Sequence, residues 1–166
     1  MIIAVAVNLS RVAHLLRRAG QLSLNDWRYL AIAVKELAIA RFRHAARPTS
    51  RIIQDLQARS AHSTVSSAPG TAMPPNTADL ACRSRAIGYA AAIVPWRSDC
   101  LPQAMAADRW LRRDQMTPEF HLGVAKDESG QLRAHAWLTC AGLTVTGGDI
   151  SDFQTFPGPS FPRAEP

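Results

Sequence analysis

Hydrophobic residues in the first 60 positions recur at intervals of three and four residues, as at Leu30, Val34, Leu37, Ala38 and Phe42. This spacing places side chains on one face of a helix. Ser23, followed by Asn25 and Asp26, has the polar character of a helix start. We therefore expect residues 1–60 to form an N-terminal helical region that covers the core or docks a partner.

The next segment, residues 61–78, is rich in Ser, Thr, Pro and Gly, and this composition predicts a linker loop. A helix is then expected from Thr77 to about Val94. It ends before Pro95, because a proline ring cannot continue a helix and restrains the residue before it.

A further helix is expected from Cys100 to about Asp114, with an apolar stripe at Leu101, Ala104, Met105 and Leu111. Pro102 is compatible with its first turn, because the amide hydrogens there have no acceptor within the helix. Cys100 is therefore expected at the N-terminus of a helix.

Beyond Pro118 the spacing changes to an alternation of polar and apolar residues, which is typical of strands. Residues 120–125 and 131–140 alternate on either side of a turn-forming segment at 127–130, which predicts a hairpin. A third strand is expected at 143–146, ended by Gly147 and Gly148. The fold class is therefore α+β, with N-terminal helices and a small antiparallel sheet in a core at 79–156. The proline-rich residues 157–166 are expected to form a loose tail.

The composition favours one folded domain. Hydrophobic residues make up 47% of the chain, charged residues 19%, and the mean hydropathy is -0.08. The net charge of +6 is carried mainly by arginine and would suit an acidic peptide. Zinc-finger spacing, aromatic RNA-binding motifs and recognition-helix patterns are not found in the sequence, so we do not expect nucleic acid as a partner.

The odd number of cysteines, at Cys82, Cys100 and Cys140, indicates reduced thiols and a cytoplasmic location. Positive charges follow the apolar segment 1–9, whereas in a secretory signal they precede the apolar segment. Segment 1–9 is also far shorter than the roughly 20 residues of a membrane span. We expect a helix or strand packed on the domain and no membrane partner.

Cys100 is a candidate nucleophile. A thiol attacks a carbonyl as its thiolate, and the helix dipole together with unpaired amide hydrogens favours negative charge at a helix N-terminus. The same amides could stabilise a tetrahedral oxyanion, with the backbone N–H of Cys100 as the first candidate donor.

His135 is a candidate general base and acid. On the strand 131–140 it alternates with an apolar face and projects to the other side with Arg133, Trp137 and Thr139. A third group must fix its tautomer. Asp149, just beyond the following strand, is our first choice for that group, and Asp152 is the alternative.

Each candidate also has a structural explanation. A cysteine at a helix start is often a small buried hydrophobe, a strand histidine often satisfies a local hydrogen bond, and an aspartate after two glycines often forms a turn. The order of helix cysteine, strand histidine and following aspartate raises the joint case. Trp96 and Trp137 are expected either to be buried beside the site or to line a cleft. Arg97 and Arg133 are expected either to be solvated surface charges or to contact an acidic peptide. His121 is expected to have a structural role. A zinc site built from Cys82, Cys140, His121 and His135 lacks short paired-ligand spacing, so we expect no metal.

Two motifs carry a resemblance to a known family. The segment Pro95-Trp96-Arg97-Ser98-Asp99-Cys100-Leu101-Pro102-Gln103-Ala104-Met105-Ala106 resembles the nucleophile segment of lasso-peptide leader peptidases, which belong to the transglutaminase-like superfamily. Ala134-His135-Ala136-Trp137-Leu138 is similar to the family's His-Ala-Trp strand, and Leu122-Gly123-Val124 to the strand before it. The resemblance covers about residues 80–152.

The resemblance implies a papain-like fold, a triad of Cys100, His135 and Asp149, and no cofactor. The implied reaction is hydrolysis of the bond between leader and core of a ribosomally synthesised precursor peptide, which frees the new amino terminus for a lasso cyclase. Because residues 1–60 lack the strand pattern of the family's recognition domain, we expect a separate leader-recognition protein. The spacing of 14 residues from His135 to Asp149 (149 − 135) leaves the identity of the acid open.

Two other functions remain as alternatives. A transglutaminase-like acyl transferase would resolve the same thioester with an amine instead of water. A non-catalytic module would only bind an acidic peptide through its basic surface. We rank the leader peptidase first, the acyl transferase second and the binding module third.

Overall fold

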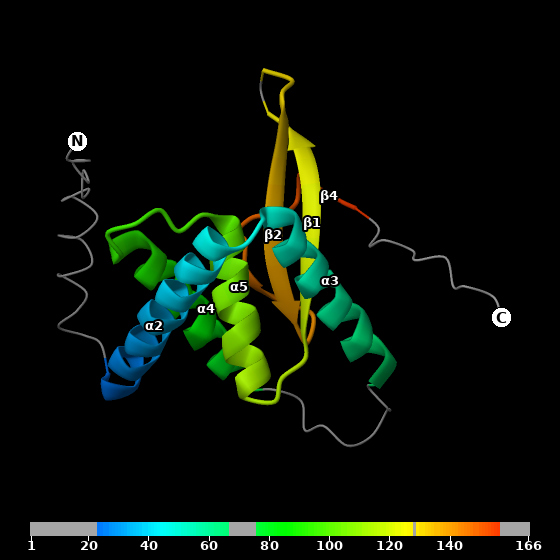
Figure 1. The fold of residues 1–166 in the computed structure, drawn as a ribbon. Coiled ribbons are helices and arrows are strands. Elements are labelled where there is room, and N and C mark those ends of the chain that lie inside the picture. The colour runs from blue at the N-terminus through cyan, green and yellow to red at the C-terminus, as the bar shows by residue number, and fades with distance from the viewer. Residues whose placement is uncertain (1–22, 67–75, 128, 157–166) are drawn as a thin grey trace.

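The computed structural model describes residues 23–66, 76–127 and 129–156. In that part of the chain, four helices are followed by a four-stranded antiparallel sheet, so the α+β class is confirmed (Figure 1). The elements are α2 (Leu24–Ala46), α3 (Thr49–Ser66), α4 (Thr77–Ile93), α5 (Cys100–Arg113), β1 (Pro118–Lys126), β2 (Leu132–Cys140), β3 (Leu143–Thr146) and β4 (Gln154–Thr155).

The helix boundaries follow from local chemistry. Ser23 and Asp26 form a capping box at the start of α2, with Ser23 Oγ accepting from Asp26 N at 3.2 Å and Asp26 Oδ2 accepting from Ser23 N at 2.9 Å. Asn76 caps α4 by accepting from Ala78 N at 3.0 Å. The end of α4 before Pro95 confirms the predicted stop.

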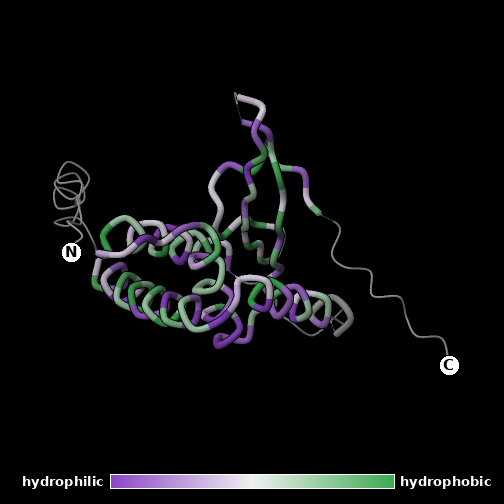
Figure 2. Tube along the Cα trace, turned by 45° about the horizontal axis from the view of Figure 1, so that its top comes forward, coloured by the Kyte–Doolittle hydropathy of each residue, from purple (hydrophilic) through white to green (hydrophobic). Residues whose placement is uncertain are grey.

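The sheet has the strand order β3-β2-β1-β4 and divides its side chains between two faces. Phe120, Leu122, Ala136, Leu138 and Cys140 face the hydrophobic core that the sheet shares with α5. His135 and Trp137 lie on the alternate positions of β2, as the strand alternation predicts. The hairpin turn between β1 and β2 projects beyond the helices in both views (Figures 1 and 2).

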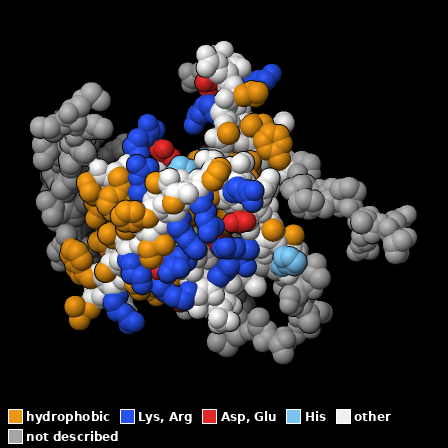
Figure 3. All heavy atoms as spheres, in the orientation of Figure 1, with side chains coloured by type: hydrophobic (Ala, Val, Ile, Leu, Met, Phe, Trp, Pro, Cys, Tyr) orange, Lys and Arg blue, Asp and Glu red, His pale blue; other side chains and the backbone are white. Residues whose placement is uncertain are grey.

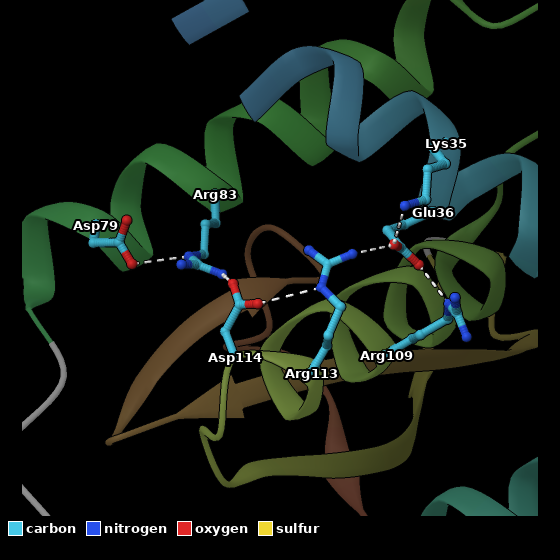
Figure 4. Close-up of polar contacts among 7 residues, drawn as sticks. All are labelled: Lys35, Glu36, Asp79, Arg83, Arg109, Arg113 and Asp114. Atoms are coloured by element: carbon cyan, nitrogen blue, oxygen red, sulfur yellow. Dashed lines mark hydrogen bonds and ion pairs between the residues drawn. The ribbon is translucent and has the colours of Figure 1, made fainter. Parts of the chain in front are cut away.

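An ion-pair network joins three of the helices (Figure 4). Glu36 of α2 is fully buried, and its carboxylate accepts from Arg109 Nε at 2.7 Å and from an Arg113 guanidinium nitrogen at 2.9 Å. Arg113 also contacts Asp114, which binds Arg83 of α4. Because Arg109 and Arg113 belong to α5, the network fixes the helix that begins with Cys100.

The structure differs from the predicted organisation in two places. Helix α3 continues to Ser66, so residues 61–66 are helical and not part of a linker loop. Ser60 connects α3 to β1, because its hydroxyl donates to Leu56 O at 3.0 Å and accepts from Phe120 N at 2.8 Å. A short strand that the sequence analysis did not predict, β4, pairs with β1 at Gly123 and Val124.

Several predictions lie outside the described residues. These are the packed N-terminal segment at 1–9, most of the predicted linker at 67–75, and the loose tail at 157–166. Among the helices that the structure describes, none combines the length and the apolar character that crossing a bilayer requires.

Candidate active site

Cys100 is the first residue of α5, and its side chain is partly buried. Asp99 occupies the N-cap position but makes no side-chain hydrogen bond to the helix, whereas Ser23 and Asn76 cap α2 and α4. The first backbone bond of α5 runs from Gln103 N to Asp99 O at 3.2 Å. The amide hydrogens that precede it have no intrahelical acceptor, so they can stabilise a thiolate or an oxyanion beside Cys100.

The chain that leads into Cys100 is held in place and contains buried polar atoms. Gln103 Nε2 donates to Ser98 O at 2.7 Å, which ties the first turn of α5 to the preceding segment. Trp96 Nε1, Ser98 Oγ and Thr146 Oγ1 are buried without a hydrogen-bond partner among the described residues. Such atoms are uncommon in native proteins. Two of them precede Cys100 and the third immediately precedes Gly147, which contacts His135.

The hydrogen bond of His135 defines its tautomer. Nε2 of this partly buried ring lies 2.8 Å from Gly147 O. A carbonyl oxygen only accepts hydrogen bonds, so Nε2 carries the hydrogen, and Nδ1 of the neutral ring then has a free lone pair. The ring is thereby prepared to act as a base through Nδ1.

Gly147 can approach the ring because it has no side chain. Its φ of +116° is one that other residues rarely adopt. A Cβ atom at this position would lie 2.4 Å from Trp137 Cβ and 3.3 Å from His135 Nε2. The carbonyl that orients His135 therefore depends on a glycine at position 147.

Aromatic rings hold His135 from its other sides. The imidazole lies 6.1 Å from the Trp137 ring at an interplanar angle of 22°, and 4.7 Å from the Phe153 ring. His121 stacks on Trp137 at 5.6 Å and 20°. The burial predicted for Trp137 is confirmed, since only 3% of this residue is exposed. These contacts limit the orientations that the imidazole can adopt.

Gly123 lets the last strand close over this aromatic layer. It pairs with His135 across the β1–β2 ladder. A Cβ atom on Gly123 would lie 2.6 Å from Gln154 O and 2.9 Å from the Trp137 ring. A side chain at this position would therefore displace β4 or Trp137.

We expect Gly147→Ala to lower catalytic activity about 10- to 100-fold, because the new methyl group must displace Trp137 or the carbonyl that orients His135. The matched control is Gly148→Ala. Gly148 also has a positive φ, of +66°, but a Cβ atom there meets no atom within 4 Å. Initial rates and thermal unfolding of both variants would be compared. Equal activity losses at equal stability would contradict the assigned role of Gly147.

The predicted acid, Asp149, is exposed and bonded locally. Its Oδ1 accepts from Ser151 N at 3.0 Å, and this interaction lowers the pKa of the Asp149 carboxyl. Among the described residues, no hydrogen bond joins His135 to Asp149 or to Asp152, or the Cys100 thiol to His135. The role of Asp149 in a triad stays a prediction, and so does the pairing of Cys100 with His135.

The other candidates have structural surroundings. Cys140 is buried in the core, and burial raises the pKa of its thiol. Cys82 accepts a hydrogen bond from an Arg85 guanidinium nitrogen at 3.3 Å. His121 Nε2 lies 2.8 Å from Thr139 Oγ1, consistent with the structural role expected for it. Within residues 23–66, 76–127 and 129–156, no group of three or more His, Cys, Asp or Glu side chains is placed to hold a metal ion.

The environment of His121 predicts a pH dependence of stability. Burial lowers the pKa of His121 below 6.5, against the opposing effect of Glu119. Folding therefore favours the neutral ring, and this contribution is present above about pH 6.5 and lost as the pH falls through the lower folded-state pKa. We expect a smaller drop in unfolding temperature between about pH 7.5 and about pH 5 in His121→Gln than in the wild type. Identical drops would contradict this prediction.

A known family matches the part of the chain that contains Cys100 and His135. The sequence pattern of one family, described as the transglutaminase-like superfamily, matches residues 44–157. The match includes α3, which was expected to belong partly to the N-terminal helical region and partly to the linker, and it contains both Cys100 and His135. It supports an activity of the cysteine peptidase or acyltransferase type. No curated protein and no solved structure matches the chain significantly.

Proposed function

Because the chain belongs to the transglutaminase-like superfamily, we propose that it is a cysteine peptidase that removes the leader from a ribosomally synthesised lasso-peptide precursor. The observation that carries the proposal is Cys100 at the uncapped N-terminus of α5, in a chain whose His135 has its tautomer set by a backbone carbonyl. The family match contributes the reaction type. The resemblance of the motifs around Cys100 and His135 to those of lasso-peptide leader peptidases suggests the substrate.

The mechanism assigns one role to each group. His135 Nδ1 takes the proton of the Cys100 thiol, and the sulfur attacks the carbonyl carbon of the scissile bond. The amide hydrogens at the start of α5 stabilise the oxyanion. His135 then gives its proton to the leaving amine, and an acyl thioester remains on Cys100. Water attacks the thioester with His135 as base, which releases a carboxylate and restores the thiol.

The first step requires the Cys100 thiol and the His135 ring to meet. Catalytic hydrogen bonds are often long in the free enzyme and tighten when substrate binds. Cys100 is the first residue of α5, and the hydrogen bond from His135 to Gly147 uses Nε2 and not Nδ1. In the proposed mechanism, peptide binding brings these two groups within hydrogen-bond distance.

The proposal also defines the partners. The substrate is the precursor peptide, a separate recognition protein presents its leader, and a lasso cyclase uses the released amino terminus. The reaction needs a free thiol, which a reducing cytoplasm provides. The role of orienting acid is assigned to Asp149, which would have to leave its bond with Ser151 to reach His135.

Incubation with a precursor peptide and its recognition protein in water enriched in heavy oxygen tests the proposal. Mass spectrometry is expected to show two fragments, with one heavy oxygen in the new carboxylate of the leader. If a supplied amine is joined to the leader instead, the chain is an acyl transferase, the second candidate allowed by the family. An intact precursor at full occupancy of the recognition protein would contradict both activities.

A further inference from the structure

A groove between α2, α3 and α5 carries an unusual concentration of arginine. We call it the arginine groove, and it is lined by Arg43, Arg47, Arg59 and Arg109 over an apolar floor that includes Ile39 and Met105. Figure 3 shows Lys and Arg side chains gathered across this face of the molecule. The lining arginines come from α2 and its C-cap, from α3 and from α5, so the positive charge results from the tertiary fold and not from one basic sequence run.

The groove has positive charge in excess. Its lining contains four arginines and two aspartates, Asp55 and Asp108, which gives a formal charge of +2 (4 − 2). The pair of Arg47 with Asp55 is 3.6 Å long, and both side chains are more than half exposed. Exposed pairs of this kind are weak and can exchange partners. No hydrogen bond or ion pair is found for the exposed Arg43 among the described residues.

The other two arginines of the groove, Arg59 and Arg109, are oriented by buried carboxylates. Arg109 binds the buried Glu36 at 2.7 Å, and Arg59 lies 3.4 Å from the buried Asp108. Their side chains nevertheless remain 41% and 46% exposed, respectively. Arginine holds carboxylates through paired N–H donors, and a side chain already oriented by one partner loses less entropy when it binds another.

We propose that the arginine groove binds an acidic segment of the peptide substrate, with an apolar side chain of that segment on the Ile39 and Met105 floor. Charge complementarity selects the carboxylates, and the floor accommodates a hydrophobic residue between them. The lining contains no aromatic residue on which a nucleic acid base could stack, which favours a peptide over single-stranded RNA. The inference rests on the proposed function in identifying this peptide as the substrate.

The groove is separate from Cys100 but belongs to the same helix. Met105 and Arg109 lie about 8 and 14 Å along the α5 axis from Cys100, and roughly 140° and 180° around it. An extended chain covers about 3.3 to 3.6 Å per residue, so the axial distance alone requires about two to four residues between the thiol and the groove, and the path around the helix adds to this number. The acidic segment therefore lies at least about that many residues from the cleaved bond.

Peptide binding to the full-length Cys100→Ala variant tests the groove without cleavage. The probe is a fluorescein-labelled peptide of Glu and Leu residues, and its control has Gln in place of every Glu. Fluorescence anisotropy is expected to show about tenfold tighter binding of the acidic peptide, with an affinity that falls as salt is added. Equal affinities would overturn the proposal, and tighter binding of single-stranded RNA of the same length would assign the groove to nucleic acid.

Two charge reversals on one helix locate the binding site. Arg43→Glu is expected to weaken binding of the acidic peptide about tenfold. Arg41→Glu changes the net charge equally, but Arg41 is exposed outside the groove, so less than about a twofold change is expected. Equal losses in both variants would overturn the assignment.

Cleavage kinetics separate this inference from the proposed function. In the peptidase, Arg43→Glu is expected to raise KM and leave kcat unchanged, because the groove is remote from the reacting atoms. Cleavage with an unaltered KM would overturn the groove and leave the peptidase standing. Selective binding of the acidic peptide without cleavage of the precursor would overturn the peptidase and leave the groove as a peptide-binding site.

Discussion

Cys100→Ala is expected to abolish precursor cleavage, with a loss on the order of 10⁴-fold or more. The substitution removes the sulfur that forms the acyl thioester, and the alanine side chain has no nucleophilic atom to replace it. Product formation would be followed by mass spectrometry at matched enzyme concentrations. Cys100→Ser would show whether a weaker nucleophile at the same position retains a trace of activity.

Cys82→Ala is the matched control for this prediction. Cys82 is also a partly buried thiol in a helix, but it lies within α4 and not at a helix N-terminus. We expect its replacement to leave cleavage within about twofold of the wild type, because Cys82 has no role in the proposed mechanism and the change from Cys to Ala is small. Full cleavage by Cys100→Ala, or loss of cleavage only in Cys82→Ala, would exclude Cys100 as the nucleophile.

The double variant Arg109→Met and Arg113→Met is expected to lower the free energy of unfolding by about 3 to 5 kcal/mol. Both guanidinium groups contact the carboxylate of the fully buried Glu36, and their removal leaves that charge without a close partner. Lys35 lies 3.8 Å away on an exposed side chain and compensates little. Chemical denaturation would measure the change.

A third substitution tests the cause of this instability. Adding Glu36→Gln removes the buried charge, so the triple variant is expected to recover most of the lost free energy. Arg41→Met is the control for loss of a surface arginine, with an expected change within about 0.5 kcal/mol. A double variant as stable as Arg41→Met would show that the buried ion pairs are not important for stability.

Elements with strong local signals could be predicted from the sequence. Pro95 marked the end of α4, and Ser23 with Asp26 marked the start of α2. Alternation along residues 131–140 placed His135 and Trp137 on the face opposite the core residues, as the structure has them. In each case the signal lies within a few residues of the feature that it predicts.

Features that depend on distant contacts could not be predicted in this way. Glu36 pairs with Arg109 and Arg113, which are 73 and 77 residues away in the sequence. The polar residues at 61–66 resembled a loop because Ser and Thr often form turns. The two-residue strand β4 is too short to show alternation, and it forms where Gly123 leaves space for Gln154.

The site was predicted in part. The position of Cys100 at a helix start followed from Pro102 and the apolar stripe of α5. The acceptor for His135 could not be found, because every residue has a backbone carbonyl and only the two glycines at 147 and 148 indicated an unusual backbone. Asp149 was predicted as the acid because it follows the third strand, but its carboxylate accepts a hydrogen bond from Ser151 N.

The carbonyl of Gly147 has a consequence for how the orientation of His135 responds to acid. A carboxylate that orients a histidine gains a proton at low pH and then loses its attraction for the ring. An amide carbonyl does not titrate in the range where proteins remain folded, so the bond from His135 Nε2 persists until the fold itself is lost. The imidazole therefore keeps its orientation in acid for as long as the Gly147 carbonyl, and not a carboxylate such as Asp149, holds Nε2.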